Sequence, residues 1–186
     1  MDTIDLTLDQ KRLLYLISKF SRPSESRDEE ETWIKKIPLM ALIYFGIEKN
    51  ILTEYDFAPT LVEYMGAVRF ANISKEGEDD IADLRVSGLL KRLKLATSHH
   101  VYVSAYRITP KGLAFITSFG KEITDAIDTI FKCDSCSGEM NIQTREDSPY
   151  MVCEGCPKEK IVEIFTIKEL AYVSSPVFSD IWLPMD

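Results

Sequence analysis

The stretch that decides the fold is residues 89–116, LLKRLKLATSHHVYVSAYRITPKGLAFI. It begins with a short strand, followed by a polar tip at 97–100 and a β-branched and aromatic run at 101–108. Thr109 then suits the N-cap of a helix and Pro110 its first position, where a missing N–H does no harm. The stretch predicts a β-hairpin followed by a helix that continues to about residue 132.

A helix is expected directly before this hairpin, at residues 78–86. Acidic residues occupy its first turn, Ile81 and Leu84 lie at helical spacing, and Ser87-Gly88 is a typical stop signal. Three earlier helices are expected at 7–20, 32–49 and 60–70, the first capped by Thr7 and the second kinked by Pro38. The polar, acidic segment 21–31 between the first two predicts a loop.

The order of helix, strand, tip, strand and Thr109–Gly112 turn resembles the winged-helix domain. In that family two strands after the recognition helix form a wing, and a Thr-x-x-Gly turn starts the next helix. The resemblance implies an α+β fold with a winged-helix domain over residues 1–128, into which the acidic loop near 21–31 is inserted.

All four cysteines lie in two Cys-x-x-Cys pairs separated by sixteen residues: Cys133, Cys136, Cys153 and Cys156. Each pair presents two thiolates on one tight turn, which is typical of a tetrahedral zinc site. Strands expected at 140–144, 150–152 and 161–165, with a turn at 146–149, predict a zinc ribbon over 129–168. We expect one structural zinc ion, because four thiolates leave no position for a substrate. Disulfides, free thiols and an iron–sulfur cluster are the alternatives.

The composition narrows the class of protein. The 186 residues carry a formal net charge of −8, which disfavours a protein that coats nucleic acid or an anionic membrane. The first residues lack a signal peptide, and no apolar run approaches the ~20 residues of a membrane span. We therefore expect a soluble intracellular protein, in cytoplasm or nucleus, whose thiols stay reduced.

Charge is distributed unevenly over the predicted winged helix. Its recognition helix carries carboxylates that a DNA groove would repel: Glu76, Glu78, Asp79, Asp80 and Asp83. The same acids could simply complement the helix dipole. The wing instead bears a basic stripe, near His99 and His100, that could contact phosphate or an acidic protein surface or be ordinary solvated charge: Lys91, Arg92, Lys94 and Arg107.

The C-terminal segment 169–186 is unusually apolar. Phe178 and Trp182 are candidate anchors for a partner, because aromatic residues dominate binding hot spots. The alternative is that this tail packs back onto the rest of the chain.

A winged helix followed by a four-cysteine ribbon is similar in domain order to the archaeal transcription initiation factor E and its eukaryal alpha-subunit relative. That resemblance implies a winged helix that binds polymerase and reads no sequence. The sequence has no phosphate loop, nucleophile elbow or His-Glu-x-x-His motif, so neither an enzyme nor a small-molecule substrate is expected. We expect a non-enzymatic zinc-binding adaptor with a protein partner, in transcription regulation; direct DNA binding through the wing is not favoured. A structural subunit of a stable cytoplasmic assembly is the alternative.

Overall fold

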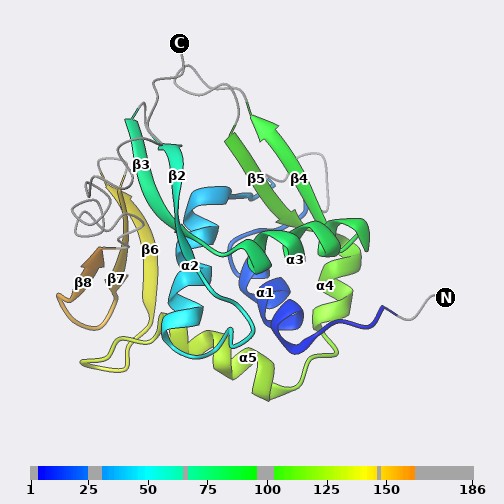
Figure 1. The fold of residues 1–186 in the computed structure, drawn as a ribbon. Helices are drawn as coiled ribbons and strands as arrows, with labels where there is room; N and C mark the ends of the chain where they lie inside the picture. The colour runs from blue at the N-terminus through cyan, green and yellow to red at the C-terminus, as the bar shows by residue number, and fades with distance from the viewer. Residues whose placement is uncertain (1–3, 25–30, 65–66, 96–102, 146–147, 162–186) are drawn as a thin grey trace, which may run out of the picture.

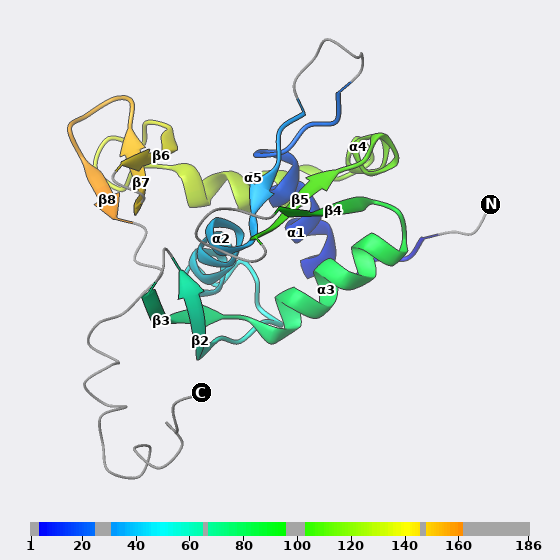
Figure 2. The same ribbon diagram turned by 90° about the horizontal axis from the view of Figure 1, so that it is seen from above.

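The computed structural model describes residues 4–24, 31–64, 67–95, 103–145 and 148–161. These residues form a mixed α+β fold with α-helices and three small antiparallel sheets, ordered β1-β5-β4, β2-β3 and β6-β7-β8 (Figures 1 and 2). The cysteine-bearing sheet lies at the opposite end of the molecule from helix α4 in both views. No helix in the described ranges is long and apolar enough to cross a membrane.

The first helix, α1 (Leu8–Ser18), confirms the expectation for this region. The Thr7 hydroxyl accepts a hydrogen bond from the Gln10 backbone N–H, and the Gln10 side chain accepts one from the Thr7 N–H. This reciprocal pair satisfies two donors that the start of a helix leaves without partners. The helix buries one apolar face in the core, formed by Leu13, Leu14, Leu16 and Ile17.

The second helix starts later than predicted. Residues Ile34–Lys35 form a short strand, β1, that pairs with β5, and helix α2 covers Lys36–Glu48. Pro38 therefore lies in the first turn of α2, where backbone N–H groups have no intrahelical partner, so a kink is not required. Helix α2 is apolar on nearly all sides and forms the centre of the core.

The prediction of a helix at 60–70 is wrong. Strands β2 (Ala58–Tyr64) and β3 (Ala67–Ile73) form a hairpin there, in the register Leu61↔Phe70. The apolar residues of this segment fit a helical spacing, but β-branched and aromatic residues together with Pro59 favour an extended chain. The pairing of β2 with β3 selects the extended chain over the helix.

Helix α3 (Lys75–Val86) and the hairpin of β4 (Leu90–Leu95) and β5 (Val103–Ile108) agree with the sequence expectation. The Ser74 hydroxyl caps α3 by accepting from the Gly77 N–H at 3.1 Å. Gly88, with φ of +73°, supplies the left-handed turn into β4. The tip between β4 and β5, with His99 and His100, lies outside the described residues.

The long helix expected from residue 109 is interrupted. It comprises α4 (Pro110–Ile116), α5 (Lys121–Asp128) and a 3₁₀ turn, η1 (Thr129–Phe131). The Thr117 and Ser118 hydroxyls donate to the carbonyls of Ala114 and Phe115, both at 2.7 Å, and Gly120 follows. Such local side-chain bonds compete with helix continuation, and glycine weakens it further.

The last sheet comprises β6 (Met140–Arg145), β7 (Ser148–Cys153) and β8 (Glu159–Ile161). The first two strands were expected; the third begins two residues earlier than predicted. This sheet shares the core of the helical part, because the buried side chains of Ile130, Phe131, Met140 and Met151 belong to the same contiguous cluster as those of α1 and α2. The described residues stop at Ile161, so the tail anchors Phe178 and Trp182 lie outside them.

Candidate metal centre

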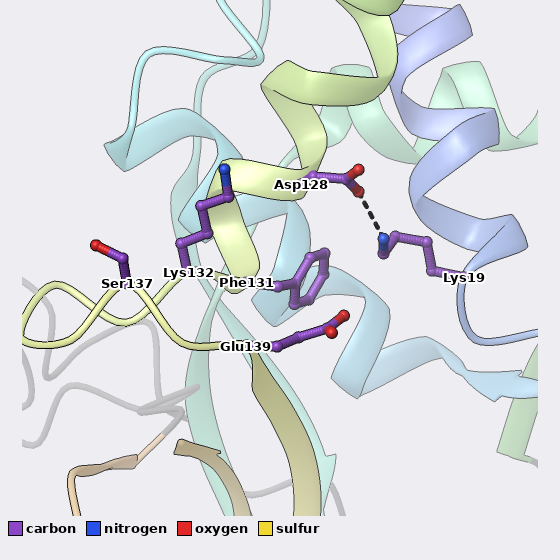
Figure 3. A pocket seen from close by; sticks show the side chains of 6 residues that line it. All are labelled: Lys19, Asp128, Phe131, Lys132, Ser137 and Glu139. Carbon is purple, nitrogen blue, oxygen red and sulfur yellow. Dashed lines mark hydrogen bonds and ion pairs between the residues drawn. The ribbon is translucent and has the colours of Figure 1, made fainter. Parts of the chain in front are cut away.

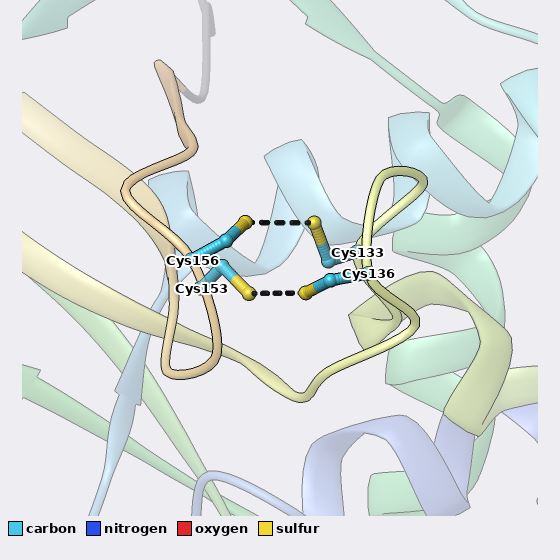
Figure 4. A group of neighbouring side chains, drawn as sticks. All are labelled: Cys133, Cys136, Cys153 and Cys156. Atoms are coloured by element: carbon cyan, nitrogen blue, oxygen red, sulfur yellow. Dashed lines mark hydrogen bonds between the residues drawn. The ribbon is translucent and has the colours of Figure 1, made fainter.

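The four cysteines lie on two short loops, the first knuckle (Cys133–Cys136) and the second knuckle (Cys153–Cys156). Their sulfurs converge on one point between these loops (Figure 4). Their Sγ atoms all lie within 4.8 Å of one another. The Cys133–Cys156 distance is 3.7 Å and the Cys136–Cys153 distance is 3.4 Å. A tetrahedral Zn²⁺ with Zn–S bonds of about 2.3 Å needs sulfurs about 3.8 Å apart. The cluster therefore forms a plausible site for a single zinc ion.

Backbone hydrogen bonds shape both knuckles. In the first, the Cys133 N–H donates to the Gly138 carbonyl and the Ser137 N–H donates to the Cys133 carbonyl, each at 2.9 Å. In the second, the Cys153 N–H donates to the Lys158 carbonyl at 3.1 Å. Short loops closed in this way hold both thiols of each pair on the same side.

Amide groups inside the knuckles point at two of the sulfurs. The Ser135 N–H lies 3.5 Å from the Cys133 sulfur, and the Gly155 N–H lies 3.3 Å from the Cys153 sulfur. The amides of Ser135 and Cys136 lower the pKa of Cys133 to about 6, since they stabilise its thiolate. This thiol is the natural first ligand at neutral pH.

The thiols of Cys136 and Cys156 resist ionisation without a metal. The Gly138 amide lowers the pKa of Cys136, but the nearby thiols of Cys153 and Cys156, together with burial, outweigh it and raise the pKa to about 12. Four thiols this close cannot all ionise unless a cation neutralises their charge. The cluster has the chemistry of a metal site, and its sulfur–sulfur distances are far beyond the about 2.05 Å of a disulfide.

Two glycines leave room for the sulfurs. A Cβ added at Gly138 would lie 3.2 Å from the Cys136 sulfur and 3.3 Å from the Cys153 sulfur. A Cβ added at Gly155 would lie 3.3 Å from the Cys136 sulfur. These distances are shorter than ordinary van der Waals contacts, so a side chain at either position would press on the cysteine sulfurs.

A small pocket of about 300 Å³ lies beside the first knuckle (Figure 3). It is lined by charged, polar and aromatic side chains: Lys19, Asp128, Phe131, Lys132, Ser137 and Glu139. Lys19 Nζ lies 2.5 Å from Asp128 Oδ1 and 5.5 Å from the centre of the Phe131 ring. These contacts hold the end of α1 against the end of α5 and against η1, next to the first knuckle. Sequence gave no signal for it, since its partners lie 109 residues apart.

The predicted basic stripe is only partly present on the surface. Lys91, Arg92 and Lys94 are exposed on β4. Arg107 does not belong to this stripe, because it is only 5% exposed. Its guanidinium lies 4.8 Å from the centre of the Trp33 ring and pairs with the Glu31 carboxylate. The segment around Trp33, far away in sequence, folds over this side chain.

Two acidic residues of α3, Glu78 and Asp80, have partners in other elements of the fold. Asp80 accepts hydrogen bonds from the Tyr55 hydroxyl at 2.5 Å and from the Gln10 side chain at 2.8 Å. Burial and this bond to Asp80 raise the pKa of Tyr55. Glu78 pairs with Lys36. Sequence inspection missed Tyr55 and Gln10, whose roles depend on contacts distant along the chain.

Comparison with known protein families gives a match over most of the chain. A search of curated proteins found none that is similar to this chain. Residues 9–159, which extend from α1 to β8 and include all four cysteines, match a family model described as the uncharacterized protein MJ1567 family. The chain belongs to the uncharacterized protein MJ1567 family.

Proposed function

We propose that this chain is a non-enzymatic, intracellular adaptor that uses a structural zinc ion and a winged-helix body to make protein–protein contacts in transcription regulation. The observation that carries the proposal is the closed cluster of four thiols. With four sulfurs around one point, a bound ion has no open position for a substrate. A metal of this kind stabilises a fold and performs no reaction.

The order of elements supports the winged-helix part. Helix α1, strand β1, helices α2 and α3, and strands β4 and β5 follow one another along the chain, with β1 on the outer side of β5. A helix before a two-stranded wing, with a third short strand beside it, is the arrangement expected of that domain. The β2–β3 hairpin then is an insertion between its second and third helices.

Charge supports a protein partner over DNA. Glu76, Asp79 and Asp83 are exposed on α3, the helix that would enter a groove. Phosphates on either side of a groove would repel these carboxylates, and the chain as a whole is acidic. A basic protein surface would accept them.

The proposal is tested by affinity purification of the tagged chain from cells of its source organism, followed by mass spectrometry. We expect proteins of the transcription machinery to co-purify with the wild-type chain and to be lost from Cys133→Ser. A Ser135→Ala variant, changed in the same knuckle at a residue that is no ligand, should retain them. Fixed-ratio recovery of a large assembly without transcription proteins, dependent on Phe178 and Trp182, would instead establish the structural-subunit alternative.

A further inference from the structure

We propose that the outer edge of strand β4 binds an extended acidic segment of a partner protein, which adds to the β1-β5-β4 sheet as a further strand. This inference deepens the proposed adaptor function and rests on it. It names the surface that the adaptor uses and the chemistry of the segment that it recognises.

The position of β4 leaves one long edge of the sheet open. Strand β5 is paired on both sides, with β1 and with β4, whereas β4 is the outermost strand. In the described ranges no strand pairs with the other edge of β4. Since β4 spans Leu90–Leu95, its edge offers a regular row of backbone donors and acceptors, which is the requirement for strand addition.

The two strands of the hairpin differ sharply in exposure. Consecutive residues of a strand point to opposite faces, and the residues 91–94 of β4 are all exposed. In β5, by contrast, residues 105–108 are all buried. Among the residues that the structure describes, the side chains of β4 from residue 91 to residue 94 are thus exposed on both faces of the strand.

The register assigns a different chemistry to each face. Arg92 lies opposite Tyr106 and Lys94 opposite Ser104, so both cations are on one face, where the Arg92 guanidinium donates to the Ser104 hydroxyl at 3.0 Å. Leu93, which is 37% exposed, lies on the other face opposite Ala105, and the exposed Lys91 lies on this face too, opposite Arg107. A complementary strand alternates carboxylates, toward Arg92 and Lys94, with apolar residues, toward Leu93.

The charge of β4 also distinguishes between the molecules that could bind its edge. Lysines on an edge strand commonly prevent pairing with another copy of the same edge, because like charges would be brought together. An acidic strand meets no such repulsion. A nucleic acid lying along β4 would be attracted by its cations but would leave the backbone row unpaired.

The test uses the full-length, zinc-loaded protein and a fluorescent peptide of alternating Glu and Val that matches β4 in length. Comparison probes are the same peptide with alternate backbone amides N-methylated and a double-stranded DNA of equal charge. We expect the unmodified peptide to bind at least ten-fold more tightly than either probe, and to slow hydrogen exchange of β4 amides. Charge reversal by Arg92→Glu/Lys94→Glu should weaken binding at least ten-fold. Lys11→Glu/Lys121→Glu, with the same change in net charge, should leave it unchanged.

Several results would overturn the inference. Equal binding of the N-methylated peptide would mean that charge attracts the peptide without strand addition. Tighter binding of DNA would assign the edge to nucleic acid. Absence of peptide binding would mean that β4 is an edge protected from pairing. The adaptor proposal fails separately. If wild type and Arg92→Glu/Lys94→Glu capture the same transcription proteins, only the β4 inference is lost; if the peptide adds to β4 but no such proteins are captured, only the transcription role is lost.

Discussion

The ring of Phe131 lies 5.3 Å, centre to centre, from the ring of Phe20. Phe131 comes two residues before Cys133, and Phe20 follows the end of α1. This contact, with the Lys19–Asp128 ion pair beside it, joins the metal centre to the helical core. The cysteine-bearing sheet thus packs into the same core as the helices, although its cysteine pattern is local in sequence.

We predict that Phe131→Ala lowers both the stability of the fold and the affinity for zinc. Phe131 is buried, and truncation of a buried Phe costs about 3–5 kcal/mol of unfolding free energy. Because its ring contacts the helical core and its backbone leads into the knuckle, zinc affinity should fall in the same variant. Denaturant unfolding and chelator competition measure the two effects.

Phe119→Ala is the matched control for Phe131→Ala. Phe119 also makes an aromatic contact, with Phe115 at 5.7 Å, but between α4 and the start of α5. It should lower stability without changing zinc affinity. Equal loss of zinc affinity in both variants would show that affinity merely follows global stability.

We predict that the affinity for zinc decreases as the pH falls. In the metal-free cluster the raised pKa values of Cys136 and Cys156 keep these thiols protonated at neutral pH, so zinc must displace their protons. Protons therefore compete with zinc, and affinity falls as pH falls, most steeply once Cys133 also protonates near pH 6. Competition with a chromophoric chelator at several pH values measures this, and affinity that stays constant on acidification would exclude thiolate ligation.

Gly155→Ala should weaken zinc binding by about ten-fold, because the new methyl group lies 3.3 Å from the Cys136 sulfur and must displace it. Gly88→Ala is the control, since Gly88 has φ of +73° and lies far from the cysteines in the turn after α3. It should lower unfolding free energy by about 1 kcal/mol at unchanged zinc affinity. If Gly155→Ala binds zinc as well as wild type, the glycine is not needed for the sulfurs.

The features predicted successfully from sequence have local signals. The two Cys-x-x-Cys pairs, the Thr7 and Thr109 caps and the Gly88 stop each depend on residues a few positions apart. Such signals survive whatever the tertiary structure does. They predicted the four-cysteine cluster and most of the helices and strands.

The features that sequence could not predict depend on distant contacts. The apolar spacing at 60–70 fits a helix and a hairpin alike, and pairing between β2 and β3 decided it. The pattern of charge around β4 suggested that Arg107 is exposed, but Trp33 and Glu31 cover it. No periodicity within β5 reports what another segment will place above it.

Arg107→Ala should lower the free energy of unfolding by about 1–3 kcal/mol, since it removes a buried cation that packs against Trp33 and pairs with Glu31. Lys91 is the matched control, because it lies directly opposite Arg107 in the β4–β5 register but is exposed. Lys91→Ala should change stability by less than about 0.5 kcal/mol. Equal effects in urea unfolding would place both cations in the same environment, contrary to the structure.

Asp80 and Asp83 distinguish structural from surface carboxylates on α3. Asp80→Ala leaves the Tyr55 hydroxyl and the Gln10 amide without their shared acceptor, which should cost about 1–3 kcal/mol of unfolding free energy. Asp83 is exposed, so Asp83→Ala should stay within about 0.5 kcal/mol of wild type in the same measurement. If α3 meets a basic partner surface, Asp83→Ala should weaken that contact without lowering stability. Asp80→Ala cannot separate the two effects, because it also lowers stability. A large stability loss in Asp83→Ala would mean that the exposed face of α3 is needed for the fold and is not free to recognise a partner.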